Sequence, residues 1–160
     1  TAGCGFNEKR NEHSESLYNP DETKLLFDYL SQRLLELKYQ YDHISVGVIA
    51  PYREQVDYMK SYDREFSQLK TSYDIDISTI DSFQGQESDV VFISLVRSND
   101  NGEVGFLSDV RRLNVAMTRA RKCLRVIGDS STISNHSFYS QFVDYCEKRN
   151  AYQSAWSYLN

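Results

Sequence analysis

The sequence predicts an α/β fold, a three-layer sandwich in which a mainly parallel sheet carries helices on both faces. Short runs rich in β-branched residues, such as 44–50 and 89–96, alternate with amphipathic segments of helical period, such as 19–38. Strands that alternate with helices form right-handed crossovers, and such crossovers place the strands in parallel. The 160 residues fit a single domain, 1–160, with one core.

The first predicted elements are a helix over 19–38 and a strand over 44–50. Asn19 is expected to cap the helix, because Pro20 and two acids follow it and leucines recur at helical spacing. The run 44–50 is short, apolar and closed by Pro51, which is typical of a buried strand.

A second helix is expected to follow through Met59 and Phe66. The segment 75–80 alternates between apolar and polar residues and predicts another strand, which is also expected to be central in the sheet. The segment 89–96 is almost continuously β-branched or aromatic, which predicts a central strand covered on both faces.

The last third of the chain predicts a helix, a strand and a helical tail. Ser108 is expected to cap a helix that runs to about Ala120. The segment 123–129 predicts the next strand, and 136–149 predicts an amphipathic helix within the tail 130–160.

Composition excludes several classes of protein. The formal net charge of −5 argues against a surface that coats nucleic acid or an anionic membrane. Three separated cysteines and three histidines without ligand spacing predict no disulfide framework and no metal site. There is no apolar run of about 20 residues and no signal peptide, so we expect an intracellular, cytoplasmic protein, or a nuclear one if eukaryotic. The opening residues read like the end of a strand, and we expect a piece of a longer chain.

The segment 111–125 is strongly basic within a chain of negative net charge, because it holds six cationic side chains and no acid. On a predicted helix, Arg112 and Arg119 share a face that points away from the core, and no acid stands four residues from either. One interpretation is a solvated basic face. The other is a phosphate-binding face, because guanidinium groups grip phosphate oxygens through paired hydrogen bonds.

A complete triphosphate site is not encoded, because the sequence contains no GxxxxGK[ST] motif. Nucleotide hydrolysis often uses an arginine from a second domain, and Arg119 suits that task. The turn SFQGQES puts Glu87 at a strand end, where a carboxylate can meet a ribose hydroxyl or a metal-bound phosphate. The motif alone is weak, and an ordinary loop with Gly85 at positive φ explains it better.

Three segments in order resemble motifs IV, V and VI of superfamily 1 helicases, in particular the Upf-like branch: VGVIAPYREQVDYM, STIDSFQGQESDVVFISLVRSN and GFLSDVRRLNVAMTRARKCLRVIGD. The resemblance extends over residues 1 to about 129. It implies the second, C-terminal RecA-like domain of an ATP-dependent DNA/RNA helicase, inactive without the upstream domain. That upstream domain would hold the P-loop, most of the ATP and the acids that bind Mg²⁺.

The resemblance also assigns residues to ATP. Arg119 takes the place of the arginine finger. Arg53 is the candidate second finger, although the nonsense-mediated-decay helicase carries its arginine three places later, where this chain has Val56. The residues placed near the nucleotide are Tyr52, Gln84, Gly85 and Glu87. An aromatic residue after a strand, such as Tyr52, is alternatively packed inside.

For a single strand of DNA or RNA, the resemblance implies contacts to the phosphate backbone and little base specificity. The residues concerned are Thr79, Ser82, Arg97, Ser98 and Asn99. Arg112 and Asn114 either take part in the site or bridge motif VI to motif V. The implied protein is a monomer whose two domains close on ATP and step along the strand.

Two other functions fit parts of the sequence. A RecA-like domain that lost catalysis would bind nucleic acid or protein. A flavodoxin-like phosphate enzyme fits the strand and helix pattern, but it leaves the order of the three motifs unexplained, and no nucleophile with a base is evident. The motifs leave the choice between DNA and RNA, the stepping direction and the pathway open.

Overall fold

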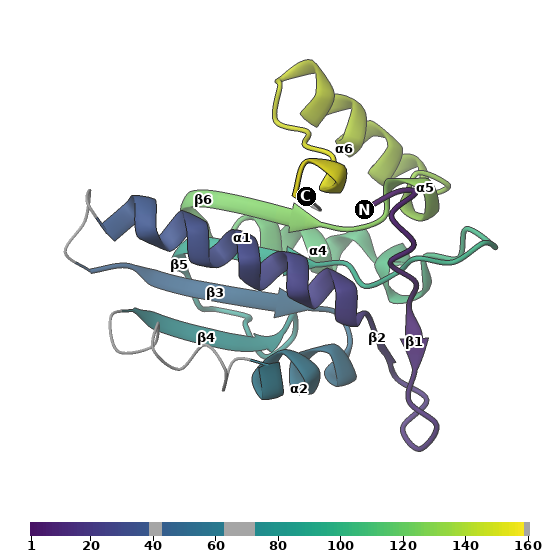
Figure 1. Cartoon of the computed structure of the whole chain (residues 1–160), viewed down its shortest axis with the longest axis horizontal. Helices are drawn as coiled ribbons and strands as arrows, with labels where there is room; N and C mark the ends of the chain where they lie inside the picture. Colours follow the sequence, from purple (N-terminus) through teal and green to yellow (C-terminus); the bar gives the residue numbers. More distant parts are fainter. Residues whose placement is uncertain (39–42, 63–72, 159–160) are drawn as a thin grey trace.

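A four-stranded parallel sheet forms the centre of the structure, a computed structural model that describes residues 1–38, 43–62 and 73–158. The strand order is β4-β3-β5-β6, and all neighbouring strands are parallel. All carboxyl ends therefore lie at one edge of the sheet, where the arrowheads point in Figure 1. The strands are β3 (Ser45–Ala50), β4 (Asp74–Thr79), β5 (Ser88–Ser94) and β6 (Ala120–Ile127). The predicted α/β fold with a mainly parallel sheet is confirmed.

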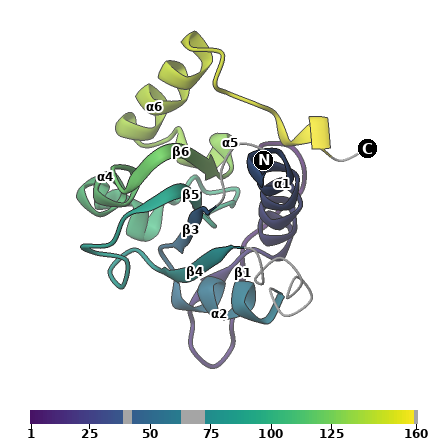
Figure 2. The same ribbon diagram turned by 90° about the vertical axis from the view of Figure 1, so that its left-hand side faces the viewer.

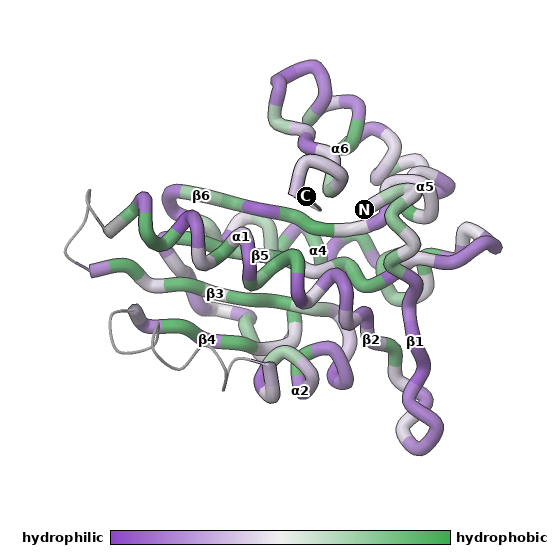
Figure 3. Tube along the Cα trace, in the orientation of Figure 1, coloured by the Kyte–Doolittle hydropathy of each residue, from purple (hydrophilic) through white to green (hydrophobic). Residues whose placement is uncertain are grey.

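Helices cover both faces of this sheet (Figure 2). The first face packs against α1 (Pro20–Lys38) and α2 (Arg53–Tyr62), and the second against α4 (Val110–Met117) and the start of α6 (Ser137–Lys148). Successive residues of β5 alternate between the two cores, and β3 and β5 are largely hydrophobic in Figure 3. This confirms the prediction of a central strand covered on both faces for 89–96. The prediction that 75–80 is also central is wrong, because β4 lies at the edge of the sheet and pairs only with β3.

Helix α1 begins as predicted. The Asn19 side-chain oxygen accepts a hydrogen bond from the Glu22 amide at 3.0 Å, which satisfies one of the unpaired donors of the first turn. Leu26, Leu30 and Leu34 are at most 1% exposed and form the predicted apolar stripe. α2 is described as far as Tyr62, so the predicted helical position of Phe66 lies outside the described residues.

The predicted helix from Ser108 to about Ala120 is wrong at both ends. A short 3-10 helix, η1 (Gly105–Ser108), comes first, and α4 then starts after Asp109 and ends at Met117. The chain is already extended at Ala120, because this residue pairs with Ser88 at the start of β5. Strand pairing thus overrides the helical propensity of the segment.

The remaining elements are short, apart from α6. The hairpin of β1 (Lys9–Arg10) and β2 (Leu17–Tyr18) was not predicted, because two-residue strands carry no detectable pattern. The tail contains α5 (Ser130–Ile133), α6 and η2 (Ala155–Tyr158). His136 caps α6, whose start was predicted. Among the described helices, none is long and apolar enough to cross a membrane.

Candidate functional site

The amino ends of β5 and β6 bring together residues of two predicted motifs. The Ser88 amide donates a hydrogen bond to the Arg119 carbonyl at 3.1 Å. Glu87 therefore lies beside the start of β6, and its Oε2 accepts a hydrogen bond from Arg121 Nε at 3.1 Å. We call the surface formed by residues 84–87 and 119–122 the amino edge.

Arg119 lies in the turn that follows α4 and not on the helix. Its amide donates to the Ala116 carbonyl at 3.2 Å, and its Nε donates to the Val115 carbonyl at 3.3 Å. Both carbonyls belong to the last turn of α4, where the helix dipole favours a cation. In the described part of the chain, no carboxylate pairs with the half-buried Arg119 side chain, and its terminal nitrogens make no hydrogen bond.

The prediction that Arg112 and Arg119 share a helix face is wrong, because Arg112 is on α4 whereas Arg119 lies in the turn after the helix ends at Met117. Arg112 Nε lies 3.5 Å from Asp81 and 3.7 Å from Asp109. Lys122 likewise lies 3.0 Å from Asp89. Asp109 before the helix, Asp81 from the neighbouring loop and Asp89 from β5 thus compensate much of the basic segment, and a search four residues away along the helix could not find them.

The loop 80–87 connects β4 to β5 and leads to the amino edge. Gln84, Gly85 and Glu87 are exposed on it. Gly85 adopts φ +84°, which agrees with the predicted glycine turn, because side chains disfavour this region. At the start of β5, a hydrogen bond from the Ser45 amide, together with Lys122, holds the pKa of Asp89 below its usual range.

The opposite side of the sheet, which we call the carboxyl edge, is formed by residues 51–53, 79–82, 97–99 and 105–112. Thr79 donates a hydrogen bond from its hydroxyl to the Ser82 hydroxyl at 2.9 Å, and both lie at the surface. These two predicted strand contacts are therefore placed together and remain accessible.

Arg97 and Ser98 are also at the carboxyl edge, but they are only 6% and 7% exposed and bond within the fold, so their predicted contact to a strand stays a prediction. Arg97 Nε donates to Glu8 at 2.9 Å. The Ser98 hydroxyl donates to Asp129 at 2.8 Å. Asn99 is half-buried and donates to the carboxylate of Glu8 and the carbonyl of Glu103. Their polar groups support the fold.

Tyr52 and Arg53 do not join the predicted nucleotide site. Tyr52 is 5% exposed and packs with its ring centroid 5.3 Å from that of Phe106, so the alternative of a packed aromatic holds. Arg53 forms an exposed pair with Asp57 at 3.1 Å. Both follow β3 at the carboxyl edge, whereas Glu87 lies at the amino edge, about 20 Å away along a strand of this length. The two groups thus lie at opposite ends of the strands, and a role of Arg53 at the nucleotide stays a prediction.

Glu22 is a buried carboxylate whose role the sequence did not reveal, because acids are ordinary in the first turn of a helix. It is 0% exposed and accepts hydrogen bonds from the amides of Leu95 at 2.9 Å and Val96 at 3.1 Å. Val96 adopts φ +71°, which is rare for a β-branched residue. Burial raises the pKa of Glu22 to about 7. Glu22 thus holds the sharp turn that positions residues 97–99.

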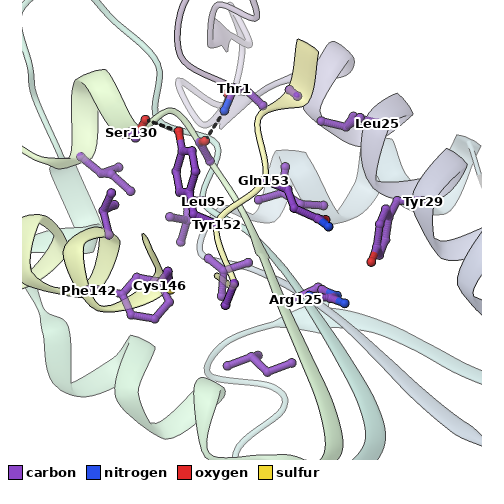
Figure 4. A pocket seen from close by; sticks show the side chains of 18 of the residues that line it. Thr1, Leu25, Tyr29, Leu95, Arg125, Ser130, Phe142, Cys146, Tyr152 and Gln153 are labelled. Atoms are coloured by element: carbon purple, nitrogen blue, oxygen red, sulfur yellow. Dashed lines mark hydrogen bonds between the residues drawn. The ribbon is translucent and has the colours of Figure 1, made fainter. Parts of the chain in front are cut away.

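A cavity of about 330 Å³ lies elsewhere, between β6, α1 and the C-terminal segment (Figure 4). Its lining is mainly apolar, and Tyr152 closes one side with a hydrogen bond to Ser130 at 3.1 Å. Of the described residues that line it, none belongs to the predicted sites. No group of three or more potential metal ligands occurs within residues 1–38, 43–62 and 73–158.

The fold and the two edges of the sheet together define the class of protein. The chain is a parallel α/β domain that presents an arginine and an acid at one edge of its sheet and hydroxyl groups at the other, without a phosphate-binding loop of its own.

Comparison with known proteins identifies the family. A family described as an AAA domain matches residues 3–131. Over 160 residues, the chain is 41% identical to the DNA-binding protein SMUBP-2 of Rattus norvegicus, covering 100% of this chain and 15% of that protein. It is 38% identical to the DNA polymerase alpha-associated DNA helicase A of Saccharomyces cerevisiae, covering 92% and 21%. It is 36% identical to Helicase sen1 of Schizosaccharomyces pombe, covering 91% and 9%. The chain belongs to this AAA-domain family, within the Upf-like superfamily 1 helicases, and spans less than a quarter of each relative.

Proposed function

We propose that the chain is the C-terminal motor domain of an ATP-dependent helicase. Its amino edge faces ATP held by an upstream domain of the same protein, and its carboxyl edge contacts a single strand of DNA or RNA. The observation that carries the proposal is the Arg119 side chain, which has no carboxylate partner in the described part of the chain. The Arg119 carbonyl accepts a hydrogen bond from the amide of Ser88, the residue after Glu87. The names of the relatives, a DNA-binding protein and helicases, support the same function.

At the amino edge, Arg119 has the chemistry of an arginine finger. Its Nε donates to the Val115 carbonyl, which leaves the terminal nitrogens available to an external acceptor such as a γ-phosphate oxygen. The pair of Glu87 and Arg121 is 50% and 58% exposed, so water screens it and Glu87 can change partner for a ribose hydroxyl. The upstream domain would hold the triphosphate and Mg²⁺, because this chain has no P-loop.

At the carboxyl edge, the hydroxyl groups of Thr79 and Ser82 suit contacts to phosphate oxygens, which carry no sequence information. The two edges are separated by the length of β5, about 20 Å. Closure on a nucleotide at one edge would therefore move a strand held at the other, as a stepping motor requires.

The test is the substitution Arg119→Ala in the full-length protein, with strand-stimulated ATP hydrolysis as the measurement. Loss of an arginine finger lowers kcat by about 10³-fold or more. Arg119→Lys should not restore the rate, because an ammonium lacks the planar fork. Strand affinity without nucleotide should stay at the parent value.

Arg149→Ala is the matched control, because Arg149 is exposed after α6, far from both edges. Its rate should equal that of the parent. Hydrolysis at the parent rate by Arg119→Ala, with the strand present, would reject the finger. A parent protein that binds the strand but hydrolyses no ATP would instead favour the binding module.

A further inference from the structure

Phe106 is a large aromatic side chain that the fold leaves in solvent at the carboxyl edge. Its side chain is 61% exposed, although the residue after it, Leu107, is only 1% exposed. One side of the ring rests on Tyr52, with 5.3 Å between the ring centroids. The sequence motifs assigned Phe106 no role, and water around such a ring is unfavourable unless another group covers it.

The backbone holds Phe106 in this position. Gly105 adopts φ +53°, and a Cβ there would overlap the Arg97 guanidinium and lie 2.7 Å from the Tyr52 hydroxyl. Only glycine lets the chain cross so closely above that buried pair. On the other side, the Leu107 carbonyl accepts a hydrogen bond from the fully buried Tyr139 hydroxyl at 2.6 Å. The exposed ring is thus fixed between two anchored neighbours.

The surroundings of the ring indicate what covers it. Phe106 borders a small hollow with Pro51, Ile80 and Arg112. Asp81 and Asp109 also line it, and they lie 3.5 and 3.7 Å from Arg112. These two carboxylates disfavour a free anion in the hollow. The hollow, about 10 Å³, is too small to enclose a base, so a flat, uncharged group would cover it from outside, against the Phe106 ring. Beside it, Thr79 and Ser82 offer hydroxyls to a phosphate, and Arg112 offsets the charge of Asp81 there.

We propose that Phe106 stacks on a base of the single strand, on the pedestal that Gly105 and Tyr52 provide. The inference rests on the proposed helicase function and adds a contact to it. A base whose phosphate lies at Thr79 and Ser82 would present a flat surface to the exposed face of the Phe106 ring, which has no stacking partner there. Stacking on an aromatic side chain accepts every base, because each base has a π face.

The experiment compares Phe106→Leu and Phe106→Trp in the full-length protein. The probes are two fluorescent strands of equal length, a thymidine homopolymer and its abasic counterpart with the same phosphates, and the same pair in RNA. Binding is measured by anisotropy without nucleotide. Phe106→Leu should weaken binding of the strand with bases by about 5- to 100-fold. It should leave binding of the abasic strand unchanged, whereas Phe106→Trp should bind both strands like the parent.

The control is Tyr145→Leu, which removes a ring that is 57% exposed on α6 and should change nothing. Equal loss of affinity on both strands would mean that Phe106 acts through the fold or the phosphates, and it would overturn the inference. So would parent affinity of Phe106→Leu for the strand with bases. If the parent bound neither homopolymer, the proposed function itself would fail, and this inference with it.

Discussion

At the carboxyl edge, the side chains of Arg97 and Glu8 are 7% and 15% exposed and lie 2.9 Å apart. At the amino edge, those of Arg121 and Glu87 are 58% and 50% exposed at 3.1 Å. The two ion pairs have similar N–O distances, but they differ in how deeply they are buried. Opening the enclosed pair would leave a charge without water or partner, whereas the open pair loses little when either side chain turns to a ligand.

This difference shows where the sheet is built to hold its shape and where it is built to bind. Behind the carboxyl edge, Glu22, Gln55 and Ser94 are all 0% exposed and hydrogen-bonded to one another through Ser94. A fixed edge suits a ring or a hydroxyl that must stay in place. The amino edge keeps its charged side chains exposed at the surface, as a site that meets a second domain requires.

The largest effect on stability should come from Arg97→Ala. It leaves Glu8 enclosed without its cation, and we expect the free energy of unfolding to fall by about 3–5 kcal/mol. Urea denaturation of parent and variant gives this difference. A loss below about 1 kcal/mol would mean that water screens the pair at the carboxyl edge as it does at the amino edge.

Glu22 should give stability a pH dependence. Burial raises its pKa from 4.5 to about 7, so the folded state binds more protons than the unfolded state between these values. This stabilisation is complete below the unfolded value and is lost as the pH rises through about 7. Between about pH 5 and 7.5, the free energy of unfolding should fall by about 2 kcal/mol from this group.

The measurement is urea denaturation of the parent and Glu22→Gln across that range. The variant cannot titrate, so the difference between the two proteins should itself shrink with rising pH. Parallel curves would show that Glu22 stays ionised in the folded state. Asp89 and Asp129 act elsewhere, because their lowered pKa values affect stability at acidic pH.

The sequence predicted the layers of this fold well, because central strands and amphipathic helices have strong periodic patterns. It placed Asn19 correctly as a cap, since the signal is local. It failed at Ser108, where a 3-10 helix precedes α4, and at Ala120, where the boundary depends on pairing with β5. A pattern along one segment carries no information about a partner strand such as that of Ser88, 32 residues before Ala120.

In the candidate site as well, some features could be predicted from the sequence and others could not. Motif order was enough to put Glu87 and Arg119 in one place, and the bond between Ser88 and Arg119 shows the contact. Motif order also put Arg97 in a groove, because a buried and an exposed arginine look alike in sequence. The roles of Glu22 and Phe106 depend on burial, which only the folded chain defines.

The smallest effect should come from Arg121→Ala. Its pair with Glu87 is exposed, so the free energy of unfolding should change by less than about 0.5 kcal/mol. The matched variant Glu87→Gln should be equally stable but should raise the KM for ATP about tenfold, because it weakens one charged hydrogen bond to the ribose. Thermal unfolding and ATP hydrolysis by both full-length variants make the comparison. If the two variants raised KM equally, Glu87 would serve to hold Arg121 rather than the nucleotide, and the open pair would be as structural as the enclosed one.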